Sequence, residues 1–160
     1  MSASPAAFRV ALVGCGRISA NHIEAIAKID GLTLTAVCDT DPARARTAGE
    51  RSGVPWYTDY GKMLAEAPID LVTVATPSGL HPEHGILAAR AGKHVISEKP
   101  MAISLDGADA LMRACEEAGV KLFVVKQNRL NATIQLLRRA GGKGRCVTLY
   151  VGNAAVRWAR

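Results

Sequence analysis

A short apolar run followed by two glycines constrains this chain more than any other feature. Residues 10–13 are apolar, Gly14 and Gly16 follow them, and helical spacing of apolar residues comes next. A continuous apolar run is typical of a buried parallel strand, and the glycines permit a sharp turn and close approach of a ligand. Free N–H groups at the start of the next helix suit a pyrophosphate. With Ser19 as the third small residue, the G-x-G-x-x-G pattern predicts nucleotide binding; a plain glycine turn is the alternative.

An acidic residue after the next strand-like run favours nucleotide binding over a plain turn. Residues 32–38 form this run, and Asp39 follows it, 25 residues after Gly14. An acid about 20 residues after the glycine turn reaches the ribose 2′-hydroxyl of a dinucleotide. This carboxylate repels a 2′-phosphate, so the sequence predicts NAD as the cofactor, in preference to NADP. Arg44 and Arg46 are close enough in sequence to weaken that preference.

Composition and apolar run lengths narrow the class of protein. The 160 residues are 49% hydrophobic and 21% charged, which is ordinary for a globular protein. No apolar run approaches the ~20 residues of a membrane span, and the first residues lack the pattern of a secretory signal. The four cysteines follow no metal or redox spacing, which is typical of reduced thiols in a cytoplasm. We therefore predict a cytoplasmic protein with no membrane partner.

Charge is distributed unevenly along the chain. Residues 1–120 contain 11 basic and 14 acidic residues, a net charge of −3, whereas residues 121–160 contain 9 basic residues and no acidic one. A basic end suits an anionic substrate or nucleic acid; a solvated face or an interface is the alternative. Aromatic content of 4% and the lack of a nucleic-acid-binding motif disfavour a base-stacking platform. We predict no nucleic-acid partner.

Strand-like and helix-like segments alternate along most of the chain, which predicts an α/β fold with a doubly wound parallel sheet. The expected strands are residues 10–13, 32–38, 54–58, 69–75, 93–97 and 121–125. The expected helices are residues 17–28, 42–51, 60–66, 81–91 and 105–117, with Asp41, Asp59 and Ser104 as N-caps, and a further helix after Asn131. Residues 146–158 alternate in polarity and predict one more strand.

Polar residues follow two of the predicted central strands. Residues 76–79 form a loop after the fourth strand, and ligands of open α/β sheets lie beyond the carboxyl ends of strands. Lys99 follows the fifth strand, where a mobile cation is a candidate for proton transfer; a plain surface lysine is the alternative. His81 and His84 have helical spacing, but no third ligand accompanies them, so we expect His81 to form hydrogen bonds or pack rather than bind a metal.

Four motifs together resemble the Gfo/Idh/MocA family of sugar dehydrogenases. They are GCGRIS at 14–19, the acid Asp39, ATPSGLH at 75–81 and EKP at 98–100. The resemblance implies hydride transfer between nicotinamide and a sugar carbon, with Lys99 near the reacting hydroxyl as the catalytic residue. It places these residues around the cofactor: Gly14, Gly16, Arg17, Ile18, Asp39, Thr76, Pro77, His81 and Glu98.

Two further segments resemble a narrower group within that family, the UDP-N-acetylglucosaminuronate 3-dehydrogenases of polysaccharide biosynthesis. These segments are FVVKQNR at 123–129 and VRWAR at 156–160. The resemblance implies a nucleotide-sugar substrate oxidised at C3, contacted by Lys126, Asn128 and Arg129, and a homo-oligomer for the full-length enzyme. A dehydrogenase for another sugar or a cyclitol is the alternative.

The resemblance also sets the expected domain organisation. Residues 1–126 correspond to the dinucleotide-binding domain, and residues 127–160 to a connecting helix and the start of a second α+β domain, truncated after its first strand. We expect that strand to lack partners and to be mobile or to promote self-association. On this interpretation the 160-residue chain oxidises no sugar by itself, and a catalytically incomplete nucleotide-binding module is a competing hypothesis.

Overall fold

The computed structural model describes residues 7–132, 135–136, 139, 148–151 and 154–157. Its internal contacts divide the chain into two units, Met1–Val125 and Lys126–Arg160. Each unit is described by itself below.

The first unit contains a six-stranded parallel sheet with the strand order β3-β2-β1-β4-β5-β6. Its strands are β1 (Phe8–Val13), β2 (Leu32–Cys38), β3 (Trp56–Tyr57), β4 (Leu71–Val74), β5 (His94–Ser97) and β6 (Leu122–Val124). Its helices are α1 (Ser19–Lys28), α2 (Pro42–Ser52), α3 (Tyr60–Glu66), α4 (His81–Arg90) and α5 (Leu105–Glu117). A short 3-10 helix, η1 (Ser78–Leu80), occupies part of the predicted loop before α4. This order is that of a doubly wound dinucleotide-binding fold, so the predicted fold class is confirmed.

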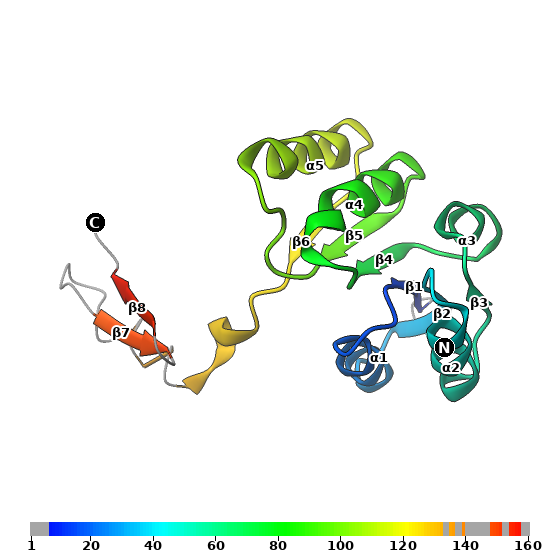
Figure 1. The fold of residues 1–160 in the computed structure, drawn as a ribbon, viewed down its shortest axis with the longest axis horizontal. Helices are drawn as coiled ribbons and strands as arrows, with labels where there is room; N and C mark the ends of the chain where they lie inside the picture. The colour runs from blue at the N-terminus through cyan, green and yellow to red at the C-terminus, as the bar shows by residue number, and fades with distance from the viewer. Residues whose placement is uncertain (1–6, 133–134, 137–138, 140–147, 152–153, 158–160) are drawn as a thin grey trace, which may run out of the picture. The chain divides into compact units, whose positions relative to one another are not determined.

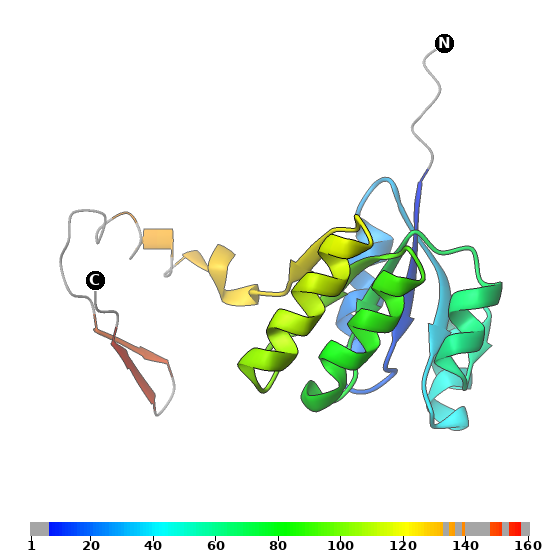
Figure 2. The ribbon, with the colours of Figure 1, turned by 90° about the horizontal axis from the view of Figure 1, so that it is seen from above.

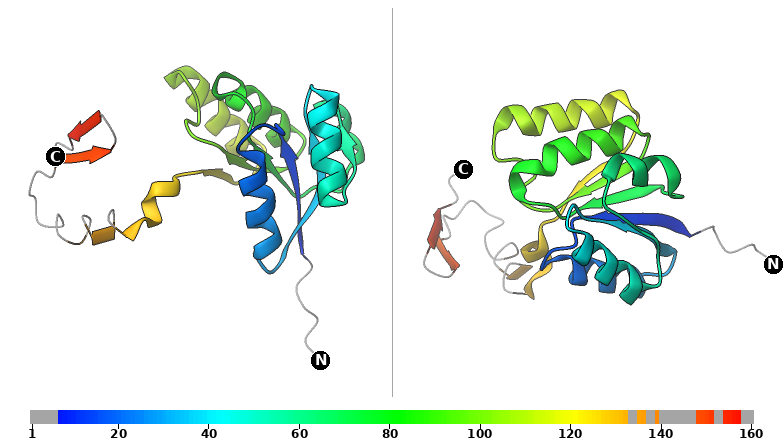
Figure 3. Two further views of the ribbon diagram at one scale, coloured as in Figure 1. Left: turned by 60° about the horizontal axis from the view of Figure 1, so that its bottom comes forward. Right: turned by 45° about the vertical axis from the view of Figure 1, so that its right-hand side comes forward.

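Helices cover both faces of the sheet, with α4 and α5 on one side and α1 and α2 on the other (Figure 1, Figure 3). Side chains alternate along each strand, so β1 contributes Ala11 and Val13 to one face and Val10 and Leu12 to the other. The larger core joins Ala11 and Val13 to buried residues of α3, α4 and α5. Figure 2 shows α4 and α5 side by side over this core. The central strands are buried on both faces, which explains why their sequences are continuous apolar runs.

Helix starts in the first unit follow the predicted caps. The Asp41 carboxylate accepts hydrogen bonds from the amides of Ala43 and Arg44 at the start of α2. Asp59 and Ser104 cap α3 and α5 in the same way. Each cap satisfies amides that have no partner within the helix and is typically worth about 1 kcal/mol. These helices begin within a residue of their predicted positions because the local cap decides where each helix starts.

The second unit corrects one prediction. After the 3-10 helix η2 (Gln127–Leu130), β7 (Thr148–Val151) and β8 (Ala154–Arg157) pair with each other as an antiparallel hairpin. The prediction of one unpartnered strand over 146–158 is therefore wrong, because Gly152-Asn153 between two apolar runs is a two-residue hairpin signal. Cys146, Val147 and Trp158, with Ile134 and Leu137 of the predicted helix, lie outside the described residues.

Candidate functional site

Polar groups at the carboxyl ends of four neighbouring strands form one row along an edge of the sheet. Asp39 follows β2, Gly14 follows β1, Thr76 comes two residues after β4, and Glu98 follows β5. Sheet hydrogen bonds continue into this row: the amide of Gly14 donates to the carbonyl of Cys38 at 2.8 Å, and the amide of Glu98 donates to the carbonyl of Val74 at 3.0 Å. Strand order therefore gathers residues from four distant stretches of sequence into a single site.

Gly14 allows the turn after β1 to lie directly against the loop after β4. Its φ is +95°, and a Cβ built on it would lie 2.6 Å from the carbonyl carbon and oxygen of Ala75. Gly16 faces open space, with nothing within 4 Å of a Cβ placed there. The two glycines thus have different tasks: Gly14 is required by close packing of backbones, whereas Gly16 leaves room at the turn. That room suits a pyrophosphate near the start of α1, which has no side-chain cap.

Asp39 is held at the end of β2 by two backbone amides. Its Oδ2 accepts a hydrogen bond from the amide of Cys15 at 2.7 Å, and its Oδ1 accepts one from the amide of Asp41 at 2.9 Å. Each carboxylate oxygen has a further lone pair, so the half-buried group retains capacity for a ribose hydroxyl. Arg44 forms an ion pair with Asp41 at 3.3 Å, and Arg46 forms one with Glu50 at 2.7 Å. Both arginines expected to weaken the preference for NAD are therefore engaged within α2 and its cap.

Glu98 and Lys99 end the row beyond β5. Glu98 is 8% exposed; its Oε1 lies 2.9 Å from Nε2 of His22 on α1, and its Oε2 accepts the amide of Lys99 at 2.9 Å. Lys99 itself is exposed, and its peptide bond to Pro100 is cis. Among the described residues, the Lys99 ammonium takes part in no ion pair. The lysine is thus available at the strand end, while the glutamate beside it is committed to internal contacts.

Two histidines of α4 fix the loop that follows β4. His81 is buried, with its Nδ1 2.7 Å from the carbonyl oxygen of Pro100 and its Nε2 2.7 Å from that of Thr76. A neutral imidazole donates to one of these carbonyls at a time, whereas an imidazolium donates to both. His84 Nδ1 lies 3.0 Å from the Thr76 hydroxyl, and burial lowers the pKa of its ring. The Tyr60 hydroxyl donates to the His84 carbonyl at 3.0 Å. His81 thus forms hydrogen bonds, as predicted, and links two loops of the row.

The thiols near the glycine turn are poor nucleophiles in this setting. Burial raises the pKa of Cys15 to about 12, with further contributions from the Asp39 carboxylate and Cys38. Burial likewise raises the pKa of Cys38 to about 11, with help from Asp39 and Asp59. Low-dielectric surroundings and a nearby negative charge both disfavour a thiolate. Neither thiol is therefore a candidate nucleophile of the row.

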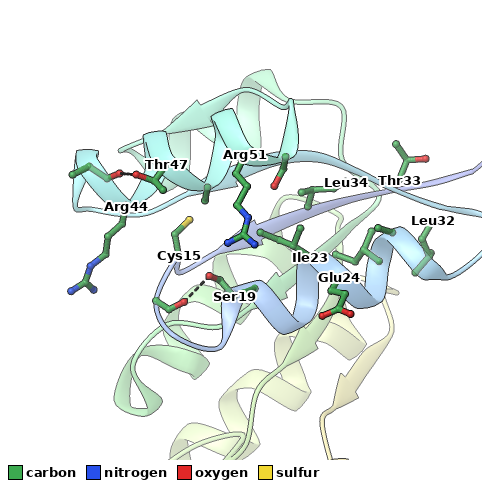
Figure 4. Close-up of a pocket in the computed structure, with 17 residues that line it drawn as sticks. Cys15, Ser19, Ile23, Glu24, Leu32, Thr33, Leu34, Arg44, Thr47 and Arg51 are labelled. Carbon is green, nitrogen blue, oxygen red and sulfur yellow. Dashed lines mark hydrogen bonds between the residues drawn. The ribbon is translucent and has the colours of Figure 1, made fainter.

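A groove of about 930 Å³ runs between α1 and α2 and meets the row at one end only (Figure 4). Cys15 and Gly16 line that end, whereas Ile23, Leu34 and Arg51 line the stretch between the helices. Ligands of doubly wound sheets bind beyond the strand ends rather than alongside the helices. We therefore locate the candidate site at the row itself, where the groove opens beside the glycine turn.

The structure brings most predicted site residues together but leaves their roles as predictions. Gly14, Asp39, Thr76, Glu98 and Lys99 lie in the row or its loops, and His81 connects two of those loops. The side chains of Arg17 and Ile18 are exposed in the turn before α1, and that of Pro77 in the loop before α4. Gly16 lies in the same turn as Gly14. The predicted substrate-binding residues, all in the second unit, are Lys126, Asn128 and Arg129. Sequence reasoning missed His22, because its partner is 76 residues away and no local pattern indicates the pair.

This arrangement of sheet, glycine turn and strand-end acid defines a dinucleotide-binding Rossmann domain. Residues 8–126 match the family model described as oxidoreductase family, NAD-binding Rossmann fold. The chain therefore belongs to the Gfo/Idh/MocA family of oxidoreductases, and the predictions of family and of NAD as cofactor are confirmed. Among the described residues, no helix is both long and apolar enough to cross a membrane.

Solved structures and curated relatives place the chain more closely within the family. It is 49% identical to the WlbA dehydrogenase of Bordetella pertussis in complex with NADH and UDP-GlcNAcA, covering 87% of this chain and 43% of that one, with a TM-score of 0.84. It is 46% identical to the WlbA dehydrogenase of Chromobacterium violaceum, in complex with the same two ligands, covering 89% and 41%, again with a TM-score of 0.84. It is also 40% identical to D-apiose dehydrogenase of Paraburkholderia graminis over 95% of this chain and 41% of that protein. The chain thus spans about two fifths of the length of these relatives.

The residues of the row fit the NAD that the family implies. Gly16 leaves open space at the turn, with nothing within 4 Å of a Cβ placed there, and the uncapped start of α1 offers amide donors to a pyrophosphate. The Asp39 carboxylate, at the end of β2, would accept hydrogen bonds from the adenosine ribose. The loop at Thr76 and the end of β5 follow along the row, where the nicotinamide half of an extended dinucleotide would be held.

Proposed function

We propose that this chain supplies the cofactor site and the catalytic lysine of an NAD-dependent dehydrogenase that oxidises the C3 hydroxyl of UDP-N-acetylglucosaminuronic acid. One observation carries the proposal: Lys99 is exposed at the end of β5, in the same row as the Gly14 turn and Asp39. Bound NAD supplies the hydride acceptor. In the proposed step Lys99 acts as a neutral amine: its nitrogen accepts a hydrogen bond from the substrate hydroxyl and takes up that proton, becoming an ammonium, as the carbon loses hydride to NAD. The alcohol thereby becomes a ketone.

The substrate part of the proposal is supported by two relatives. Both WlbA dehydrogenases, at 49% and 46% identity, were crystallised with NADH and UDP-GlcNAcA. The substrate carries a diphosphate and a carboxylate, and the 9 basic residues without an acid in residues 121–160 suit such an anion. We propose Lys126, Asn128 and Arg129 as its contacts, with the guanidinium matching a phosphate or carboxylate.

The first test concerns the cofactor and uses the 160-residue chain. Calorimetric titration should show tighter binding of NAD than of NADP, because Asp39 accepts the ribose hydroxyl and repels a 2′-phosphate. Asp39→Ala should narrow that difference by weakening NAD, whereas the matched surface variant Asp30→Ala should leave it unchanged. Tighter binding of NADP by the wild-type chain would contradict this assignment of Asp39.

The second test concerns the substrate and uses the enzyme that contains this chain. NADH formation should be fastest with UDP-N-acetylglucosaminuronic acid, compared with D-apiose and myo-inositol. Lys99→Met should lower turnover by ~10²-fold or more while NAD still binds, as loss of a positioned proton-transfer group does. Faster turnover of D-apiose would favour the alternative of another sugar, consistent with the relative at 40% identity. NAD binding without NADH formation from any of them would favour a nucleotide-binding module.

A further inference from the structure

We infer that His22 is a positioning residue: it holds the Glu98 carboxylate, and through it the backbone that presents Lys99. This inference rests on the proposed role of Lys99 and adds a residue from a different element of the fold. His22 lies on α1, the helix that starts at the glycine turn, whereas Glu98 and Lys99 follow β5. The contact therefore ties the part of the site that would hold the cofactor phosphates to the part that would hold the reacting hydroxyl.

Two hydrogen bonds transmit the position of His22 to Lys99. His22 Nε2 lies 2.9 Å from Glu98 Oε1, and since a carboxylate only accepts, the histidine nitrogen carries the hydrogen. The other oxygen, Glu98 Oε2, accepts the amide of Lys99 at 2.9 Å. One carboxylate thus bridges an imidazole and the lysine backbone, and both of its oxygens are engaged.

Burial makes this bridge sensitive to His22. The side chains of His22 and Glu98 are 16% and 11% exposed, so removal of the imidazole leaves a mostly buried carboxylate oxygen without its partner. Within residues 7–132, Glu98 has no other ion pair. An unpaired buried carboxylate is costly, and it relieves the cost by turning toward water or taking up a proton. Either change weakens its bond to the amide of Lys99.

The presentation of Lys99 depends on that backbone because no described side-chain contact holds its ammonium. Four hydrogen bonds hold the backbone of residues 98–100. The Glu98 amide donates to the Val74 carbonyl at 3.0 Å, and the Ser97 hydroxyl donates to the Glu98 carbonyl at 3.1 Å. The Lys99 amide donates to the Glu98 carboxylate at 2.9 Å, and His81 bonds the Pro100 carbonyl at 2.7 Å. The bond from the Lys99 amide is the one that His22 controls. The flanking bonds keep the segment in place when it is lost, so a change at His22 acts locally.

The test measures amide hydrogen exchange in the 160-residue chain by NMR. His22→Ala should raise the exchange rate of the Lys99 amide by about tenfold, as expected for loss of one charge-assisted hydrogen bond. His22→Gln retains an N–H donor and should restore the wild-type rate. Asn21→Ala, an exposed neighbour on α1, is the matched control and should leave the rate unchanged. Glu98→Ala removes the acceptor itself and should give at least as large an increase, and adding His22→Ala to it should give no further increase.

Several outcomes would overturn the inference. An unchanged Lys99 rate in His22→Ala would do so, as would additive effects of His22→Ala and Glu98→Ala, because independent residues do not act through one bridge. An equal increase at the amide of Val72, in the sheet interior, would assign the effect to global destabilisation. In the enzyme that contains this chain, His22→Ala should lower kcat several-fold with KM for NAD unchanged. If the wild-type protein neither binds NAD nor forms NADH, the proposed function fails. The exchange rates still decide whether His22 holds Lys99.

Discussion

Replacement of Gly14 by alanine should destabilise the first unit because two separate costs fall on one Cβ. The backbone has a φ of +95°, and a Cβ would lie 2.6 Å from Ala75 carbonyl atoms and 2.7 Å from the Thr76 nitrogen. A left-handed conformation costs an L-residue about 1–2 kcal/mol. Forcing an extra carbon into a packed site costs about 1–3 kcal/mol more, and backbone atoms cannot rotate away as a side chain can. We therefore expect a loss of about 2–5 kcal/mol, a large part of the stability of a domain this size.

Urea unfolding followed by circular dichroism measures this loss, and Gly16→Ala is the matched control. A Cβ on Gly16 meets nothing within 4 Å, so the free energy of unfolding should change by no more than ~0.5 kcal/mol. Gly16→Ala should nevertheless weaken NAD binding, because the added methyl occupies the space expected for the pyrophosphate. The pair thus separates a structural glycine from a ligand-binding one. If Gly14→Ala unfolds at the wild-type urea concentration, the close packing of these loops is not what requires the glycine.

Two further predictions concern ionisable groups. Arg9 forms two side-chain hydrogen bonds to Asp70 and holds the pKa of that carboxyl below its ordinary value. The stabilisation that this pair gives the folded state is therefore present above the unfolded-state pKa of about 3.9. It is lost as pH falls toward the folded-state pKa. Asp70→Asn should therefore lower the free energy of unfolding by up to ~1 kcal/mol at pH 7, since the pair is partly exposed. Urea unfolding should show a smaller difference between variant and wild type at pH 3. An equal difference at both pH values would contradict the link between this pair and pH. Cys15, with its pKa raised to about 12, should react with iodoacetamide at pH 8 about 10²–10³-fold more slowly than a free thiol, as followed by mass spectrometry. Alkylation at the rate of glutathione would show that the thiol is not shielded.

The sequence alone predicted those parts of the protein that depend on neighbouring residues. The apolar run before Gly14 and the acid at Asp39 identified the first two strands and the ligand class, because strand burial and turn geometry depend on residues that are consecutive in the sequence. Asp41, Asp59 and Ser104 located helix starts for the same reason. The hairpin of β7 and β8 differs from the prediction although Gly152-Asn153 carries a signal for it, because alternation of polarity over residues 146–158 also predicts one long strand.

Only the tertiary structure decided which distant groups meet. His22 and Glu98 are 76 residues apart, and no sequence periodicity indicates their contact. They meet because β5 lies two strands from β1 in the sheet, with α1 following β1 and Glu98 following β5. His81 is similar: its helix position was predictable, but its two bonds to the Thr76 and Pro100 carbonyls depend on how α4 crosses between β4 and β5. Local patterns fix backbone conformation, whereas contacts between strand ends follow from the crossovers that order the sheet, and these are set by packing across the whole core.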